Sequence, residues 1–287
     1  MRRQQAFTLI ELIVVVVLLG VMAAGAGMLI TRPIEAYTDQ LRRQQLVDSA
    51  EMSLRMIAAD IHRALPNSIR LSDNGPTGWT LEMINTVDGA RYRDEAGDIF
   101  NTADQILDFT TADNSFNLLG RFSNLANGSY SLRAVIYNTN NTSIYTDAAL
   151  GAGSGVITAA GNITLSDDGV DQQRVLLSAA HRFTFQSPGQ RVFLVDGPVS
   201  YICDSATGSL SRFTGYGYQQ THAAAITAAT SPGVAGGRVA GQISVCNIDY
   251  QQGTPQRGGL ITLELSLSNA EGGTVSLLHQ IHVDNLP

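Results

Sequence analysis

The pattern of apolar and polar positions divides the first 65 residues into two helical segments. The first, residues 7–30, reads FTLIELIVVVVLLGVMAAGAGMLI and contains one charged residue, Glu11. At about 1.5 Å per residue, a helix of this length spans a bilayer core of roughly 30 Å. Arg2 and Arg3 precede it and favour a cytoplasmic N-terminal end. We therefore expect residues 7–30 to form a single membrane-spanning helix.

Residues 31–65 have the pattern of an amphipathic helix. Pro33 favours a kink or a new helical start, and Pro66 disfavours helical geometry in Leu65, so we expect the helix to end there. Between them, apolar residues recur at spacings of three and four, as on one face of a helix. These residues are Ile34, Tyr37, Leu41, Val47, Ala50, Leu54, Ile57, Ile61 and Ala64. Charged residues, Asp60 among them, are expected mostly on the other faces, and the apolar face needs a sheet to cover it.

The remaining residues, 66–287, predict a β-rich domain, because short stretches of alternating apolar and polar residues are separated by turn residues. Asp196-Gly197-Pro198 predicts a hairpin turn, and the low-complexity stretches 138–142, 148–161 and 223–237 predict surface loops or sheet edges. The predicted fold class is α+β, with a long N-terminal helix packed on an antiparallel β-sheet domain. The expected strands are Trp79–Ile84, Gln105–Phe109, Tyr130–Tyr137, Arg174–Ser178, Arg182–Gln186, Arg191–Val195, Val199–Cys203, Val239–Cys246, Leu260–Leu267 and Thr274–Val283.

Composition narrows the classes of function. The chain of 287 residues suits one membrane helix plus one fairly large domain or two small ones. The net charge is −7 and lysine is absent, which argues against a nucleic-acid surface. Cys203 and Cys246 both lie in the part expected outside the cytoplasm, where an oxidising compartment favours a disulfide between them. Two reduced, buried thiols are the alternative.

Candidate chemistry is sparse. His62 is expected to be solvated, and His279 and His282 are three apart in a predicted strand, which points them to opposite faces and makes a poor metal pair. The sequence has no metal-binding, phosphate-binding or serine-hydrolase motif. Residues 167–171 could bind calcium or form an acidic turn, and residues 213–218 could form an aromatic contact surface or a packed hairpin. We expect no metal, no cofactor and no enzymatic activity.

The stretch from Ala6 to Glu11, reading AFTLIE, resembles the processing site of type IV prepilins and type II secretion pseudopilins. The resemblance implies that a prepilin peptidase removes residues 1–6 by cleavage between Ala6 and Phe7. It further implies that Phe7 becomes methylated and that Glu11 guides docking into a filament. One residue departs from the family pattern, because Ala6 replaces the usual glycine; it is small enough to fit and implies slower processing.

A second resemblance extends along the predicted amphipathic helix. Residues 55–67 are similar to the end of the soluble helix in the larger minor pilins. These include the O-type minor pilin of the mannose-sensitive haemagglutinin (MSHA) pilus and the J-type pseudopilin of type II secretion, and residues 31–37 look especially like the former. The resemblance implies a minor pilin that helps initiate or shape an MSHA-like pilus. The partners implied are other major and minor pilins, the prepilin peptidase, the inner-membrane assembly platform and the lipid bilayer.

In this interpretation the chain has a leader at 1–6, a transmembrane assembly helix at 7–30, an amphipathic soluble helix at 31–65 and a periplasmic domain at 66–287. It starts as a single-pass inner-membrane protein and ends in a pilus or pseudopilus. Three alternatives remain open from the residues alone. The apolar run could be a secretory signal cut after Ala26, the chain could be a minor pseudopilin at a pseudopilus tip, or it could be a membrane-anchored periplasmic binding protein.

Overall fold

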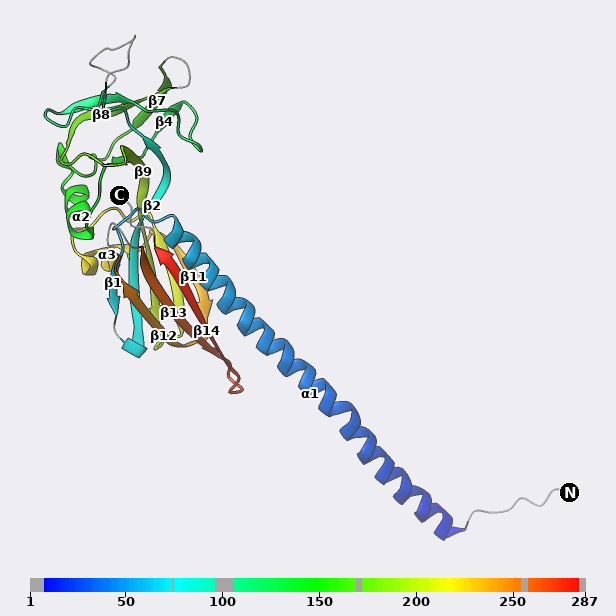
Figure 1. Ribbon diagram of the computed structural model, residues 1–287. Coiled ribbons are helices and arrows are strands. Elements are labelled where there is room, and N and C mark those ends of the chain that lie inside the picture. The colour runs from blue at the N-terminus through cyan, green and yellow to red at the C-terminus, as the bar shows by residue number, and fades with distance from the viewer. Residues whose placement is uncertain (1–7, 74, 96–105, 169–171, 254–257, 284–287) are drawn as a thin grey trace.

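The fold is dominated by one long helix that enters a β-rich head (Figure 1). The structure, a computed structural model, describes residues 8–73, 75–95, 106–168, 172–253 and 258–283. Helix α1 (Leu9–His62) is continuous over 54 residues, with Pro33 inside it. The two predicted helical segments therefore form one helix, and Pro33 does not start a new one.

Helix α1 ends three residues earlier than the expected end at Leu65. Arg63 is the C-terminal cap, and its N–H bonds to the carbonyl oxygens of Asp60 and Ile61. Beyond it the backbone pairs with strand β2 (Gly78–Arg91), because Leu65 N donates to the carbonyl of Ile84 at 2.8 Å. Pairing with the sheet therefore ends the helix before Pro66 can do so.

Three sheets make up the head. A six-stranded sheet has the order β1 (Arg70–Asp73), β2, β9 (Arg191–Asp204), β10 (Ser209–Thr214) and β11 (Ala235–Gly241), with β5 (Arg133–Val135) also paired to β9. A three-stranded antiparallel sheet contains β12 (Ile243–Gln251), β13 (Gly259–Ser268) and β14 (Thr274–Val283). A five-stranded sheet has the order β3 (Asp113–Asn117), β8 (Gln173–Phe183), β7 (Ile163–Asp167) and β4 (Gly128–Tyr130), with β6 (Ser154–Gly155) paired to β8 in parallel. The short helices are η1 (Gly75–Thr77), α2 (Asn141–Leu150) and α3 (His222–Ala229).

The head has two lobes that share the long strands β2 and β9 (Figure 1). The proximal lobe packs against one face of the last turns of α1, from Leu46 onward, and contains the three-stranded sheet; the distal lobe contains the five-stranded sheet and α2. Each lobe has its own apolar core. Leu54, Ile57 and Ile61 of α1 are buried in the proximal core, and each such side chain contributes about 1.5–3 kcal/mol by its removal from water. The predicted fold class, a long helix packed on antiparallel sheet, is confirmed.

Several predicted strand limits are wrong, and β9 shows why. Asp196-Gly197-Pro198 was expected to be a hairpin turn, but β9 runs through it without interruption. Its partner β2 pairs with it on both sides of this point, with register shifts around Thr86. A bulge therefore absorbs the turn-forming residues at the boundary between the lobes.

Other strands were merged, divided or absent. The stretch predicted at 174–178 and the first two residues of the one predicted at 182–186 belong to the single strand β8, and residues 184–186 are not in a strand. The stretches predicted at 130–137 and 239–246 are each divided between two strands. Residues 106–109 are not in a strand. Helix α3 lies almost wholly within the stretch 223–237, and α2 begins in the stretch 138–142 and ends in the stretch 148–161. Asn140 and Thr221 cap these helices by accepting hydrogen bonds from Ser143 N and Ala224 N. The alanine-rich stretch 223–229, expected to be a surface loop or a sheet edge, therefore forms a short, capped helix.

Candidate functional site

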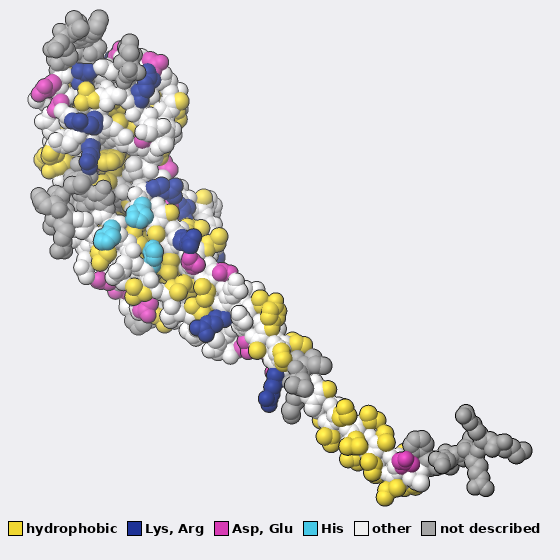
Figure 2. All heavy atoms as spheres, turned by 45° about the vertical axis from the view of Figure 1, so that its right-hand side comes forward, with side chains coloured by type: hydrophobic (Ala, Val, Ile, Leu, Met, Phe, Trp, Pro, Cys, Tyr) yellow, Lys and Arg dark blue, Asp and Glu magenta, His cyan; other side chains and the backbone are white. Residues whose placement is uncertain are grey.

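The N-terminal half of α1 is an exposed apolar rod. Residues Leu9–Ala26 are long and apolar enough to cross a membrane, and none of this stretch is buried. Its large side chains are between 45 and 79% exposed, and Figure 2 shows them as a band along the free part of the helix. Exposed apolar surface of this extent marks a contact with lipid or with other protein. The buried face of α1 begins only at Leu46, so Ile34, Tyr37 and Leu41 are also exposed.

Glu11 lies at the beginning of this rod and caps the helix. Thr8 is the N-terminal cap, and the Glu11 carboxylate lies 3.5 Å from Thr8 N and 3.4 Å from Thr8 Oγ1. A carboxylate in this position also interacts favourably with the positive end of the helix dipole. The Thr-x-x-Glu spacing could have predicted this partner from sequence. Ala6 and Phe7, the residues of the expected cleavage and methylation, lie outside the described residues.

A buried ionic cluster joins α1 to the head. Asp60 was expected on a solvent-facing side of the helix, but its side chain is only 4% exposed. Its Oδ2 atom accepts hydrogen bonds from Tyr201 Oη at 2.6 Å and from Arg212 Nε at 2.7 Å, while Oδ1 accepts one from Arg63 at 2.6 Å. Burial raises the pKa of Asp60, but the hydrogen bonds from Arg212, Tyr201 and Arg63 lower it by more, so the pKa is below its usual value. The carboxylate is therefore held in its charged form.

A second buried pair, Arg70 and Glu82, lies within the proximal lobe. Arg70 Nε donates to Glu82 Oε2 at 2.8 Å, and Tyr216 Oη donates to Glu82 Oε1 at 2.9 Å. Burial raises the pKa of Glu82, and the Arg70 guanidinium opposes that shift. The guanidinium also stacks on the Tyr145 ring, 3.5 Å from its centroid. Tyr216 therefore packs into the protein. For this residue the second interpretation of residues 213–218 holds, in which the aromatic rings are packed and do not form a contact surface.

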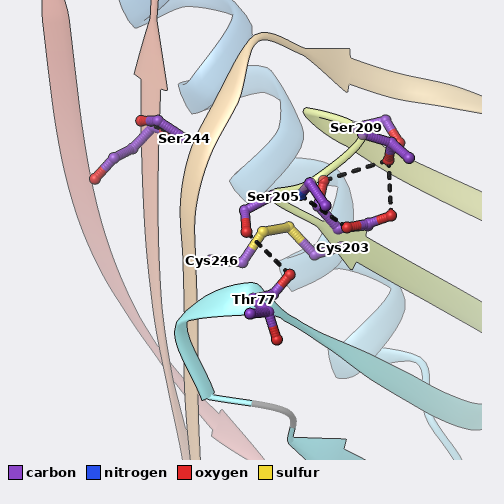
Figure 3. The surroundings of a disulfide bond; sticks show 10 residues. Thr77, Cys203, Ser205, Ser209, Ser244 and Cys246 are labelled. Atoms are coloured by element: carbon purple, nitrogen blue, oxygen red, sulfur yellow. Dashed lines mark hydrogen bonds between the residues drawn. A yellow bond between two sulfur atoms is a disulfide. The ribbon is translucent and has the colours of Figure 1, made fainter.

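The expected disulfide is present. Cys203 of β9 and Cys246 of β12 are bonded, with their Cα atoms 6.3 Å apart (Figure 3). Both residues are buried, and the bond links the six-stranded sheet to the three-stranded sheet. Beside it, Ser205 N and Ser205 Oγ both donate to the carbonyl of Thr77 at 3.0 Å. The disulfide is therefore a covalent link between the two sheets that cover α1.

The candidate metal residues are dispersed. His62 is exposed at the end of α1, and His279 and His282 lie on opposite faces of β14, where His279 shares the face of buried Ile281. Among the described residues, no group of three or more His, Cys, Asp and Glu side chains could hold a metal ion. In the acidic stretch 167–171, Arg121 pairs with Asp167 and Asn117 Nδ2 donates to Asp168; residues 169–171 lie outside the described part.

Comparison with known proteins gives one match. Residues 1–27 match the family model described as the prokaryotic N-terminal methylation motif. The matched range contains Arg2 and Arg3, Phe7, Glu11 and most of the apolar run. No curated protein and no solved structure gives a significant match to the chain.

Proposed function

We propose that this chain, which carries a type IV pilin-like methylation motif on a single apolar helix, is a minor pilin. Its role is to help initiate or shape an MSHA-like pilus after cleavage between Ala6 and Phe7. The proposal rests on one observation. The exposed apolar stretch Leu9–Ala26, with Glu11 at its start, belongs to the same helix whose C-terminal part is packed against the folded head. Before assembly this apolar stretch would be buried in lipid, and after assembly it would be buried against neighbouring helices.

Glu11 is proposed to set the register of assembly. Cleavage would place a new α-amine on Phe7, the residue directly before Thr8. Thr8 N already lies 3.5 Å from the Glu11 carboxylate, and consecutive Cα atoms are about 3.8 Å apart. The new amine is therefore within reach of Glu11 of its own chain while the subunit waits in the membrane. On assembly, the amine of a neighbouring subunit would replace it.

The energetic argument rests on the surroundings of this charge. An unpaired carboxylate costs up to about 2.5–3.5 kcal/mol at the centre of a membrane helix, and less near its ends. Pairing with an amine removes much of this cost, because attraction between opposite charges is strong where water is excluded. A neighbour bound in any other register would not bring its own amine to Glu11 and would add no second positive charge beside the carboxylate. The pair therefore favours one axial offset between subunits.

The head is proposed to act by structure and not by catalysis. Two buried acids, Asp60 near the end of α1 and Glu82 of β2, already accept hydrogen bonds from arginine and tyrosine side chains. The Asp60 cluster and the apolar face of α1 fix the head to the helix, so both would move together during assembly. Residues 31–37 support an MSHA-like pilus; residues 55–67, similar also in J-type pseudopilins, support a pseudopilus tip as the second candidate.

The test replaces Glu11 and counts the subunit in purified fibres. We expect Glu11→Gln to leave insertion and folding intact and to lower the number of copies per fibre about tenfold, the ratio produced by about 1.4 kcal/mol. The control is Glu35→Gln, an exposed change on the same helix beyond the apolar stretch, which should leave the count unchanged. Equal counts for wild type and Glu11→Gln in fibres of either system would contradict the proposal.

A further inference from the structure

The part of α1 between the membrane-spanning stretch and the head carries an apolar stripe, which consists of Ile34, Tyr37 and Leu41. Their side chains are 56, 63 and 42% exposed. A helix turns by about 100° per residue, so the three side chains lie within about 60° of one another around the helix axis. The stripe is therefore one apolar surface that the head leaves uncovered.

The stripe lies on the side of α1 that faces away from the head. The rotation per residue places it nearly opposite to Leu46 and Ile57, whose side chains are buried against the head. The sequence predicted one apolar face along this helix. The spacing of six residues between Leu41 and Val47 instead moves the apolar side around the helix. The predicted face is therefore two faces, and only the second packs on the sheets.

The charged residues next to the stripe all lie on the other side of the helix. Between positions 33 and 46 they are Glu35, Asp39, Arg42 and Arg43. The same rotation places all four within about 100° of one another, on the side of the head. Arg42 Nη1 lies 3.7 Å from Glu271 Oε1, in the turn between β13 and β14 that Figure 1 shows projecting from the head back along α1. This segment is thus amphipathic, and its apolar side is free.

The distance of the stripe from the membrane-spanning stretch depends on the tilt of the helix. Tyr37 lies 28 residues beyond Leu9, about 42 Å along the helix. With Leu9 at one edge of a core of about 30 Å, an upright helix places Tyr37 about 12 Å beyond the other edge, outside a headgroup layer of about 5–8 Å. At a tilt of about 35°, within the range of membrane helices, Tyr37 lies only about 4 Å beyond the core. A tilted helix therefore brings the stripe into the headgroup layer.

We propose that, in the membrane-inserted subunit, the stripe lies in the headgroup layer and holds α1 tilted, with the head on the side turned away from the bilayer. Amphipathic helical segments bind the interface through their apolar face, and tyrosine is enriched at this depth. A tilt towards the stripe keeps the four charged residues in water and lifts the turn at 269–273 away from lipid. A tilt towards the opposite side would press both into the bilayer. This inference rests on the proposed membrane insertion, but not on cleavage or on fibre assembly.

The test places a tryptophan on either side of the helix in the full chain, inserted in nanodiscs of phosphatidylcholine. Bromine atoms on the acyl chains near the headgroups quench tryptophan at short range. We expect quenching to be about twofold or more stronger for Tyr37→Trp than for Ala36→Trp, because only position 37 faces the interface. Ala36→Trp is the matched control, since Ala36 is one residue nearer to the membrane-spanning stretch but faces about 130° away from the centre of the stripe. Trp79 is fully buried in the head, so its emission is a constant background.

A third variant separates failure of this inference from failure of membrane insertion. Val16→Trp lies within the membrane-spanning stretch and should be quenched by lipids brominated at mid-chain. If it is quenched while positions 36 and 37 are quenched equally or not at all, the tilt is wrong and the proposed function stands. If Val16→Trp is not quenched, insertion is wrong and this inference is wrong with it. If Tyr37→Trp escapes lipid bromine and its emission shifts to the blue only when two chains share a nanodisc, a second subunit covers the stripe, which also overturns the proposal.

A measurement on the wild-type chain avoids dependence on the tryptophan variants. Polarised infrared spectra of oriented bilayers report the tilt of α1, because α1 contains most of the helical residues that the structure describes. We expect a tilt of about 35° for wild type, above the average of about 20° for membrane helices. The double variant Ile34→Gln/Leu41→Gln should be more upright, because it removes two of the three apolar side chains. An upright wild-type helix, or an unchanged tilt in the double variant, would contradict the proposal.

Discussion

The carboxylate of Asp60 on α1 accepts a hydrogen bond from Arg212 of β10 at 2.7 Å. The two residues are 152 positions apart in sequence, so the contact forms only when the helix lies against the folded sheet. Tyr201 of β9 donates to the same oxygen. This cluster lies at the C-terminal end of the helix, where it fixes the direction of the whole rod relative to the head.

Removing the charge of Asp60 should weaken the attachment of α1. Asp60→Asn leaves Arg212 without its carboxylate partner in a largely buried position. Loss of one partner from a buried ion pair lowers the free energy of unfolding by about 3–5 kcal/mol. Because Arg212 and Arg63 are partly exposed, we expect a smaller decrease here, about 2 kcal/mol. Denaturant unfolding of the full chain in detergent measures the change.

Glu51→Gln is the matched control for Asp60→Asn. It removes the partner of Arg55 on the same helix, but both side chains are exposed. Exposed pairs of this spacing contribute about 0.3–0.5 kcal/mol. Similar losses of stability in the two variants would show that the Asp60 cluster has no special role.

The same carboxylate predicts a specific pH dependence. The pKa of Asp60 is lower in the folded chain than its ordinary value, which is about 3.9 in unfolded peptides. Its stabilising contribution is therefore complete above about pH 4 and is lost as the pH falls through the folded pKa. We expect the free energy of unfolding of wild type to fall more steeply with acid than that of Asp60→Asn. Unfolding curves between pH 2 and pH 6 test this, and parallel curves would contradict it.

Removing the disulfide should destabilise the proximal lobe. Cys203 and Cys246 are 43 residues apart, and closing a loop of this length contributes about 4 kcal/mol in the chain-entropy model. The variant Cys203→Ala/Cys246→Ala, with alanine chosen because both sites are buried, should unfold at lower urea concentration than oxidised wild type. Reduced wild type should resemble the variant. If all three proteins unfold together while thiol titration confirms reduction, the bond has no stabilising role.

The sequence predicted the fold best where local pattern and tertiary pairing agree. The limits of β14 (Thr274–Val283) were predicted without error, because its apolar positions alternate and residues 269–273 form a turn before it. Prediction failed where tertiary pairing prevails over local signals. Strand β9 passes through Asp196-Gly197-Pro198 because β2 pairs with it on both sides. No local pattern contains that information.

The residues of the candidate site could likewise be predicted from the sequence only where the signal is local. Glu11 is recognisable because it interrupts an apolar run, and a Thr-x-x-Glu spacing also indicates its cap. Asp60 looked solvated because its partners, Tyr201 and Arg212, are more than 140 positions away. The pairing of Arg91 with Arg191 was not recognised, because only the register of β2 and β9 brings these two residues together. Contacts between distant segments decided each of these failures.

The most direct test of the account is to determine the first residue of the mature protein by mass spectrometry of chains from purified fibres. The account predicts that residues 1–6 are absent and that the chain begins with N-methylated Phe7, whose amine can then pair with Glu11. A chain that still begins at Met1, or that begins after Ala26, in cells that make normal fibres would contradict it.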